Sequence, residues 1–511
     1  MMASRMKSML RGARDGWRIL RRINVELAFF FILIAFGPIL VFYPQIIQDR
    51  VEAMHEEQIA NMSAGQRDSF LGKTIAGVSQ IRALSKHPFE LLMPPMAGSY
   101  SDEYGRKPFI LLGQMALSVY IGITQWVATS SAAGVALGLW PVYVNGLNVA
   151  IYLASFPTLQ AYMHDTAQGE KDIFFPRYVL FGVLGQAGGF LGYAAVGYVY
   201  PYVFPSKTVT YSMLWCNVLM AVIFFSTLLF LPHVLPAHKQ KKAASKGDDG
   251  GTGGRARAHT AIVQGGVEAT KGLRRAFLHA AGGVKALARP RLRWRRCLLI
   301  MAVIQRVIEL SAANNEEGFL VNYTLREPFV WSNEERARYQ MANFFAGMLG
   351  ELFGAILLRK IFRVRYTILV FLGCIGGVAS ALIAAMATET WHIYMKIPFD
   401  ALTSMGGSSL KIITEIVEPD ELGKLFATVV VMLTFGGLMQ NLLLNEIFKW
   451  TIDSFRPAAW YVLVALTSAI SVMWIFAHFI YVAEEPFILS DKQKNKQRAL
   501  TLEQQRHDNA S

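Results

Sequence analysis

Long apolar runs, separated by short polar segments, recur along the whole chain. The clearest runs cover residues 27–47, 108–128, 211–231, 367–387 and 461–482. Each reaches the length of about 20 apolar residues that an α-helix needs to cross a bilayer. Together with weaker runs, they predict twelve spanning helices, at residues 26–47, 74–98, 108–128, 136–161, 174–200, 209–231, 297–320, 340–358, 366–387, 391–415, 425–447 and 458–482. The pattern therefore predicts an all-α polytopic membrane protein.

A long polar segment divides these runs into two sets of six. Residues 232–296 contain no spanning run, and residues 247–254 within them are rich in Gly and Asp, which is typical of a flexible linker. The expected order is a basic tail at 1–25, a six-helix bundle at 26–231, the linker, a six-helix bundle at 297–482 and a second tail at 483–511.

The composition indicates that lipid is the solvent of most of the chain. Hydrophobic residues make up 53% of the 511 residues and charged residues 17%, whereas soluble domains carry about 25% charged residues. Cys216, Cys297 and Cys374 lie in or beside apolar runs, which predicts reduced thiols rather than a disulfide. The first apolar run is too long for a signal peptide and lacks a small-residue cleavage site, so we interpret it as a retained helix.

The net charge of +14 is concentrated in two segments. Residues 232–296 hold 15 Lys or Arg against 3 Asp or Glu, and residues 1–24 hold 7 against 1. Basic segments beside membrane spans face the cytoplasm, so both termini are expected there. This distribution argues against a nucleic-acid partner. The expected partners are the lipid bilayer and a small molecule, for a monomer in the plasma membrane or an endolysosomal membrane.

One short loop between the second and third predicted helices carries the strongest motif. Residues 98–107 read GSYSDEYGRK and fit the pattern G-x3-D-x2-G-R-K. Its defining positions are Gly98, Asp102, Gly105, Arg106 and Lys107. Glycine permits a tight turn, the aspartate can face a helix N-terminus, and the basic pair supplies counter-charges. The alternative is a solvated loop whose basic pair only obeys the positive-inside rule.

The spacing and position of this loop resemble the signature loop of the major facilitator superfamily. The resemblance implies two six-helix bundles that rock about a central substrate site. It also implies an inside gate, in which Asp102 contacts the start of the eleventh helix near residues 423–425 when the gate is closed.

Within the superfamily, the chain is similar to the solute carrier 46 family, with its best stretches at residues 25–48, 95–113, 323–331 and 408–426. This similarity implies transport of an organic anion, often together with protons. The chain departs from the family's folate transporter where that protein has acidic or basic residues, and it lacks the cysteines of that transporter's outside disulfide. The departing positions are Ile151, Gly182, Ala313 and Leu410.

Charged residues inside the second helix suggest a binding surface. Arg82, Lys86 and Glu90 recur at intervals of four residues and therefore share one helix face. Charges at membrane depth are costly and usually functional. Arg82 and Lys86 are thus candidate binding residues for an anionic substrate. The alternatives are a Lys86–Glu90 pair that neutralises itself and a second helix that begins later.

The seventh and tenth helices carry the remaining candidates. A desolvated carboxylate binds a proton more readily than one in water, so four residues are candidates for proton coupling: Glu316, Glu317, Glu309 and Asp400. The alternative for the acidic end of the seventh helix is a water-exposed vestibule. Further candidates for substrate binding are Arg306, Asn314, Asn315 and Lys411, the last of which could equally belong to the inside gate.

Other motifs are few. Asn61-Met62-Ser63 is a glycosylation sequon in a predicted outside loop. No nucleotide loop, metal cluster or catalytic triad is recognisable, so neither an enzyme nor a cofactor is expected. The sequence favours a secondary transporter of an organic anion, with proton symport as one mode. The alternative is a receptor or scaffold with the same fold that binds a ligand without translocating it.

Overall fold

The computed structural model describes residues 24–129, 138–166, 171–203, 208–231, 285, 287–291, 293–417 and 419–508. The predicted linker lies largely outside these residues, as do the first 23 residues of the basic tail. The N-terminal half contains α2 (Asn24–Met54), α3 (Glu56–Ala60), α4 (Ala64–Tyr104), α5 (Lys107–Thr129), α7 (Trp140–Thr166), α8 (Lys171–Ala194), the π-helical turn η1 (Ala195–Val199), α9 (Tyr200–Val203) and α10 (Thr208–Phe230).

The C-terminal half begins after the linker and is also helical throughout. It contains α14 (Arg295–Thr324), α15 (Asn333–Leu352), η2 (Phe353–Ile361), α16 (Tyr366–Met386), α17 (Thr390–Tyr394), α18 (Ile397–Thr403), η3 (Ser404–Ser408), α19 (Ser409–Ile416), α20 (Pro419–Thr451) and α21 (Ala458–Asp508). Each of the twelve predicted spans overlaps a described helical segment of these two halves, and the all-α polytopic fold is thereby confirmed.

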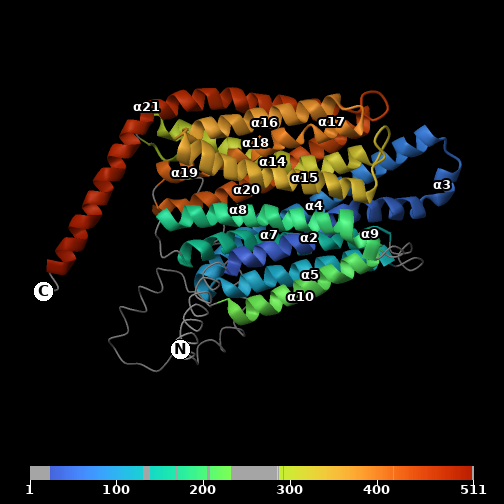
Figure 1. Cartoon of the computed structure of the whole chain (residues 1–511), viewed down its shortest axis with the longest axis horizontal. Coiled ribbons are helices and arrows are strands. Elements are labelled where there is room, and N and C mark those ends of the chain that lie inside the picture. Colours follow the sequence, from blue (N-terminus) through green and yellow to red (C-terminus); the bar gives the residue numbers. More distant parts are fainter. Residues whose placement is uncertain are drawn as a thin grey trace, which may run out of the picture.

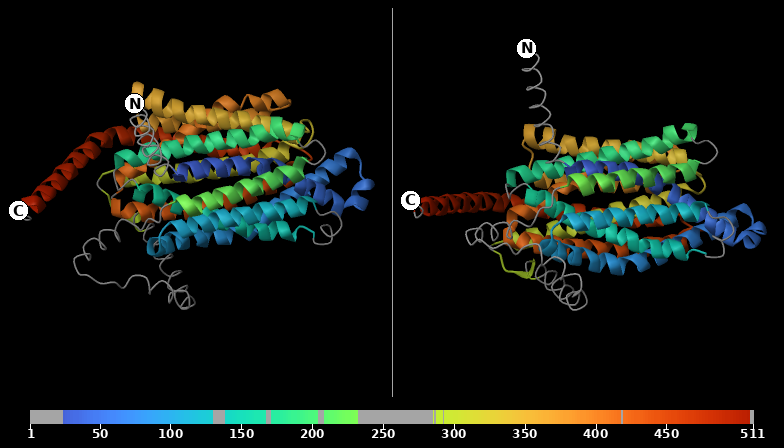
Figure 2. Two further views of the ribbon diagram at one scale, coloured as in Figure 1. Left: turned by 60° about the horizontal axis from the view of Figure 1, so that its bottom comes forward. Right: turned by 90° about the horizontal axis from the view of Figure 1, so that it is seen from below.

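The long helices run side by side, with the N-terminal half in blue to green and the C-terminal half in yellow to red (Figure 1). The halves meet along two pairs of helices, α4 with α20 and α8 with α15. The end of the bundle that carries α3 is called the α3 end below. Figure 2 shows the same parallel arrangement from two further sides.

The largest differences between the helix bounds and the predicted spans occur at three places. α4 begins at Ala64, ten residues before the predicted start, because a polar first segment extends beyond the apolar run. The predicted tenth helix is broken into α17, α18, η3 and α19. α21 continues past Pro486 to Asp508 and leaves the bundle as an arm (Figures 1 and 2). Proline removes a backbone hydrogen bond and bends a helix.

Eight of the described helices are long and apolar enough to cross a membrane by themselves. α4, α7, α14 and the broken helix α17–α19 are not among them. α4 and α14 contain the charged residues Arg82, Lys86, Arg306 and Glu309. Because such residues lower the hydropathy of a span, these helices depend on the bundle to shield them.

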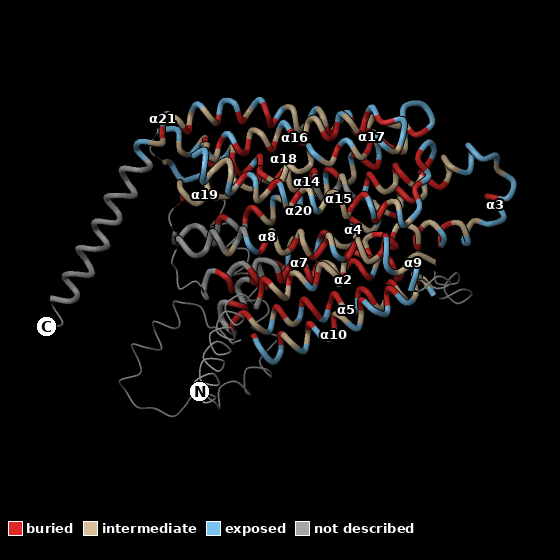
Figure 3. The backbone as a smooth tube through the Cα atoms, viewed as in Figure 1, coloured by how far each residue is buried: buried red, intermediate tan, exposed pale blue. Residues whose placement is uncertain are grey.

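The outer surface of α10 is apolar, as expected for contact with lipid. Its exposed large side chains recur at helical spacing, and Figure 3 shows the exposed positions along this helix in pale blue. They are Tyr211, Leu214, Trp215, Val218, Val222, Phe225 and Leu229. An exposed apolar stripe of this length marks a surface that another apolar phase covers.

Close helix contacts hold the N-terminal half together. A Cβ on Gly188 of α8 would lie 2.2 Å from the carbonyl oxygen of Phe30 on α2, and one on Gly192 would lie 2.8 Å from that of Ile34. Glycine is therefore the one residue type that permits this approach without a backbone shift. Such small-residue contacts are the usual way in which membrane helices pack.

Candidate functional site

The N-terminal half contains a half-buried cation that contacts two tyrosines. The guanidinium carbon of Arg82 lies 4.2 Å from the ring centroid of Tyr43 on α2, and Arg82 Nη2 donates to the hydroxyl of Tyr120 on α5 at 3.2 Å. Arg82 Nε is buried without a hydrogen-bond acceptor among the described residues. A cation over an aromatic face is stabilised by about 0.5–2 kcal/mol. No described carboxylate lies within ion-pair distance of Arg82.

The rest of the predicted basic face on α4 is neutralised locally. Lys86 Nζ lies 3.1 Å from Glu90 Oε1, and His87 Nε2 lies 3.6 Å from Glu90 Oε2. This geometry agrees with the alternative in which Lys86 and Glu90 form a pair. Arg82 is consequently the residue of this face that keeps an unbalanced charge among the described side chains.

The C-terminal half also contains a half-buried arginine, on α14. Arg306 Nη1 donates to Glu309 Oε2 at 3.1 Å, and Gln305 Nε2 donates to the same oxygen at 2.9 Å. The side chains of Arg306 and Glu309 are 13% and 14% exposed. The other carboxylate oxygen of Glu309 packs against Gly406 of η3, where a Cβ would lie only 1.7 Å away.

A separate charged cluster joins α14, α16 and α18. Lys396 Nζ donates to Glu316 Oε1 and, at 2.5 Å, to Ser380 Oγ, while Asp400 Oδ2 lies 3.5 Å from the same nitrogen. Ser380 Oγ in turn donates to Asp400 Oδ1. The ring centroid of Trp460 lies 5.6 Å from Lys396 Nζ, and Lys396 is 1% exposed.

Glu316 and Asp400 were among the residues predicted from the sequence, whereas Lys396, which joins them, was not predicted. The signal was weak, since Lys396 and Asp400 are four residues apart at the polar start of a predicted span. The structure does not bring this cluster together with Glu309, which contacts Arg306 and Gln305 instead.

Several predicted residues are only partly described. The backbones of Asn314, Asn315 and Glu317 belong to α14, and their side chains lie outside the described part of the chain. Lys411 lies in α19, one helical turn after Gly407, with an intermediate exposure.

The motif loop is described in part. Gly98 and Asp102 lie in the last turns of α4, and their side chains are outside the described residues, as are those at positions 421–424. The predicted contact of Asp102 with the eleventh helix therefore stays a prediction. Gly105 has a φ of 95°, a conformation that favours glycine.

The basic pair of the motif is fixed rather than solvated. Arg106 is 6% exposed, and its Nη1 donates to Ser101 Oγ at 2.6 Å. Lys107 Nζ donates to the carbonyl oxygen of Leu228 on α10 at 2.6 Å. These contacts tie the basic pair to its own half of the molecule.

Charged contacts join the two halves at the α3 end. Asp68 of α4 accepts hydrogen bonds from Arg326 Nη1 at 3.1 Å and from Arg456 Nη2 at 2.7 Å. Arg326 follows α14, and Arg456 lies between α20 and α21. One carboxylate of the N-terminal half is thus held by two arginines of the C-terminal half.

Further contacts continue this seam along α4 and α20. Lys73 Nζ lies 2.5 Å from Asp453 Oδ2, and its hydrogen bond lowers the pKa of Asp453 below the ordinary value, so this carboxylate stays charged at neutral pH. Gln80 donates to Glu446 at 3.0 Å and accepts from Lys449. We call this set the α3-end latch; its members are Asp68, Lys73, Gln80, Arg326, Glu446, Lys449, Asp453 and Arg456.

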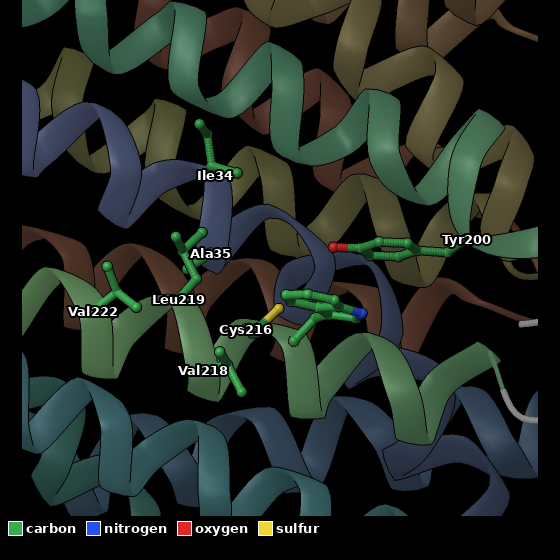
Figure 4. Close-up of a pocket in the computed structure, with 8 residues that line it drawn as sticks. Ile34, Ala35, Tyr200, Cys216, Val218, Leu219 and Val222 are labelled. Carbon is green, nitrogen blue, oxygen red and sulfur yellow. The ribbon is translucent and has the colours of Figure 1, made fainter. Parts of the chain in front are cut away.

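A small cavity of about 160 Å³ lies away from these charged groups, between α2, α9 and α10 (Figure 4). Ile34 and Ala35 line it from α2, and Cys216, Leu219 and Val222 line it from α10. Its lining is mostly apolar, and none of the candidate residues for substrate or proton binding contributes to it. Among the described residues, no group of three or more His, Cys, Asp or Glu is arranged to hold a metal ion.

Comparison with known sequences gives relatives among solute carrier 46 proteins, while no protein-family model matches. The chain is 22% identical over 375 residues to the Drosophila melanogaster probable peptidoglycan muropeptide transporter SLC46, covering 70% of this chain and 64% of that protein. It is 22% identical over 168 residues to Mus musculus solute carrier family 46 member 2, covering 31% and 33%. The chain thus spans less than two thirds of either relative.

Solved transporter structures share the fold. The human organic anion transporter MFSD10 (TETRAN) aligns with a TM-score of 0.57 at 14% identity, covering 89% of this chain and 98% of that one. The POT family transporter PepTSo gives 0.58 at 14% identity, covering 91% and 99%. The proton:xylose symporter XylE of the major facilitator superfamily gives 0.57 at 13% identity, covering 89% and 96%.

These comparisons and the helix arrangement define the class: the chain is a multi-pass membrane protein with the major facilitator fold. Within that class it is similar to solute carrier 46 proteins. The resemblance based on the motif loop and the family stretches is thereby confirmed at the level of fold and family likeness.

Proposed function

We propose that this protein is a secondary transporter that moves a small organic anion across a membrane by alternating access. The observation that carries the proposal is Arg82, a half-buried cation inside the N-terminal half with no described carboxylate within ion-pair distance. A charge at this depth is costly unless a counter-ion compensates it. An anionic substrate supplies that counter-ion when it binds.

Arg306 supplies a second guanidinium, so that each half of the molecule contributes one cationic group to the proposed substrate site. In transporters of this fold the substrate site lies near the bilayer midplane between the halves. One sequence relative is a probable muropeptide transporter, and one solved structure with the same fold is an organic anion transporter. Both descriptions agree with an anionic substrate. A muropeptide, which carries carboxylate groups, is therefore the first substrate to test.

The test is uptake of a radiolabelled muropeptide into proteoliposomes that contain the full chain. We expect uptake by the wild type, at least tenfold slower uptake by Arg82→Gln, and unchanged uptake by Lys360→Gln, which removes an exposed cation. Counterflow exchange distinguishes transport from binding. Muropeptide binding without counterflow would contradict the proposal and favour the receptor alternative.

We further propose that the α3 end faces the outside and both termini face the cytoplasm. Asn61 supports this orientation, because it is exposed at the α3 end within a glycosylation sequon and its amide makes one local hydrogen bond, to Glu57 O. Glycosidase treatment should increase the gel mobility of the wild type and leave Asn61→Gln unchanged. A mobility that does not change in either protein would contradict glycosylation of this site.

A further inference from the structure

Two carboxylates share one guanidinium in the interior of the C-terminal half. Glu309 accepts directly from Arg306, and Arg306 also acts electrostatically on Glu351 of α15. With both carboxylates ionised, the group carries one negative charge in excess. Uncompensated charge in a membrane interior is costly, so an additional positive charge is favoured there.

Glycines make room for both carboxylates. A Cβ on Gly406 would lie 1.7 Å from Glu309 Oε1, and a Cβ on Gly182 would lie 2.8 Å from Glu351 Oε2. Gly406 belongs to η3 of the same half, whereas Gly182 belongs to α8 of the N-terminal half. Glu351 therefore lies at the interface along which the two halves move.

The neighbouring amide provides a place for a proton. Gln305 is fully buried, donates to Glu309 through Nε2, and leaves its Oε1 without a hydrogen-bond partner among the described residues. Rotation of this amide exchanges its nitrogen and oxygen. A protonated Glu309 can then donate its O–H to the amide oxygen, which satisfies the buried acceptor.

Few other charged or titratable groups approach this site in the described part of the chain. Cys374 of α16 faces Glu309, and Arg306 faces both carboxylates. Gly182 of α8 lies against the carboxylate of Glu351, and Gly406 of η3 lies against the carboxylate of Glu309. The balance of charge thus depends on Arg306, Glu309 and Glu351.

Building on the proposed function, we infer that Arg306, Glu309 and Glu351 form a site that exchanges a proton for an anion contact. A proton converts one carboxylate to a neutral carboxylic acid, and no other bond changes. Arg306 then loses an ionised partner and binds an oxyanion of the substrate. Because Glu351 lies against Gly182 of α8, its neutralisation also removes a charge from the contact between the halves, so proton and anion binding promote movement together.

The proton site can be tested without any substrate. Infrared difference spectra of the full chain in liposomes, recorded between neutral and mildly acidic pH, should show a carboxylic-acid C=O band in the wild type. The double variant Glu309→Gln/Glu351→Gln should lose this band, and Glu334→Gln, which alters an exposed carboxylate of α15, should retain it. Arg306→Gln should show the band already at neutral pH. A band of equal size in the double variant would overturn the inference.

The anion exchange is tested by adding a muropeptide at mildly acidic pH. We expect the carboxylic-acid band to increase in the wild type, and we expect no increase in Arg306→Gln. Muropeptide uptake that leaves the band unchanged would overturn the exchange while supporting transport. Failure of all muropeptide uptake, with an intact band that needs Glu309 or Glu351, would instead contradict the muropeptide as cargo.

Substitutions of two neighbouring glycines test whether the position of the Glu309 carboxylate affects proton binding. Gly406→Ala places a methyl group where the carboxylate lies, whereas Gly407→Ala meets only Arg306 Nη1 at 3.9 Å. We expect Gly406→Ala to shift the pH at which the band forms and Gly407→Ala to leave it unchanged. If the band forms at the same pH in the wild type, Gly406→Ala and Gly407→Ala, the packing of Glu309 against Gly406 has no part in proton binding.

Discussion

At the scale of single residues, Arg82 is stabilised by aromatic groups instead of by a carboxylate. The ring face of Tyr43 contacts the guanidinium of Arg82, and the hydroxyl of Tyr43 is buried without a partner among the described residues. The hydroxyl of Tyr120 accepts a hydrogen bond from Arg82. The same chemical change, Tyr→Phe, should therefore have opposite consequences at the two positions.

We predict that Tyr120→Phe destabilises the protein by about 1.5–3 kcal/mol, the usual worth of a hydrogen bond to a charged group. Tyr43→Phe keeps the ring and removes an unsatisfied hydroxyl, so its effect should be close to zero or stabilising. Thermal unfolding in detergent, followed by tryptophan fluorescence, measures both. Equal destabilisation by the two variants would contradict this assignment of roles.

Lys396 gives a second prediction at this scale. Lys396→Met leaves Glu316 and Asp400 without their cation, and breaking a buried pair in this way costs about 3–5 kcal/mol. The triple variant Lys396→Met/Glu316→Gln/Asp400→Asn removes all three charges and should recover most of the loss. Thermal unfolding again provides the measurement. A single variant as stable as the wild type would show that the cluster carries little energy.

At the scale of helices, glycine placement determines how closely the elements pack. Gly188→Ala would push a methyl group against the Phe30 carbonyl oxygen at 2.2 Å, so α2 and α8 must separate. We expect a lower unfolding temperature and less folded protein in the membrane. Gly122→Ala on α5 is the matched control, since nothing lies within 4 Å of its added Cβ. Equal unfolding temperatures for the two variants would argue against a tight α2–α8 contact.

The sequence predicted helices better than it predicted contacts between them. An apolar run of spanning length is a local signal, and all twelve runs are helical in the structure. The predicted tenth helix is broken into α17, α18, η3 and α19, and Gly406 of η3 packs against Glu309 of α14, a contact between helices that no local pattern predicts. The polar start of α4 was missed because it lies beyond the apolar run.

The difference between local patterns and contacts between helices also explains which contacts of the site residues could be predicted from the sequence. Arg306 and Glu309 are three residues apart on one helix, so their contact could be anticipated from helical spacing. Lys396 and Glu316 are 80 residues apart, and Asp68 and Arg456 are 388 apart. No local pattern encodes such pairs, because the packing of separate helices brings them together.

At the scale of the whole molecule, the α3-end latch connects the two halves at the end where the proposed alternating access requires them to separate. Its two arginines and the carboxylate of Asp68 come from opposite halves. Arg326 is 4% exposed and Arg456 is 31% exposed, so water screens one contact more than the other. The latch therefore favours closure at this end without preventing opening.

We predict that Asp68→Asn shifts the population toward an open α3 end. The change leaves two arginines without their anion, and the expected shift is on the order of 1–3 kcal/mol, because partial exposure reduces the cost of a fully buried broken pair. Spin labels at Gly65→Cys and Trp450→Cys, in a chain whose three cysteines are replaced by alanine, report the separation of the halves. Both labelled positions are exposed.

Arg67→Gln is the matched control, because Arg67 pairs with Glu52 at 2.9 Å within the N-terminal half. Loss of that pair removes a charge close to Asp68 without unlinking the halves. We expect a longer and broader distance distribution for Asp68→Asn alone. If both variants show the distribution of the unsubstituted protein, closure at the α3 end rests on apolar contacts of α4 with the C-terminal half, such as Gly72 with Ile452, rather than on the latch.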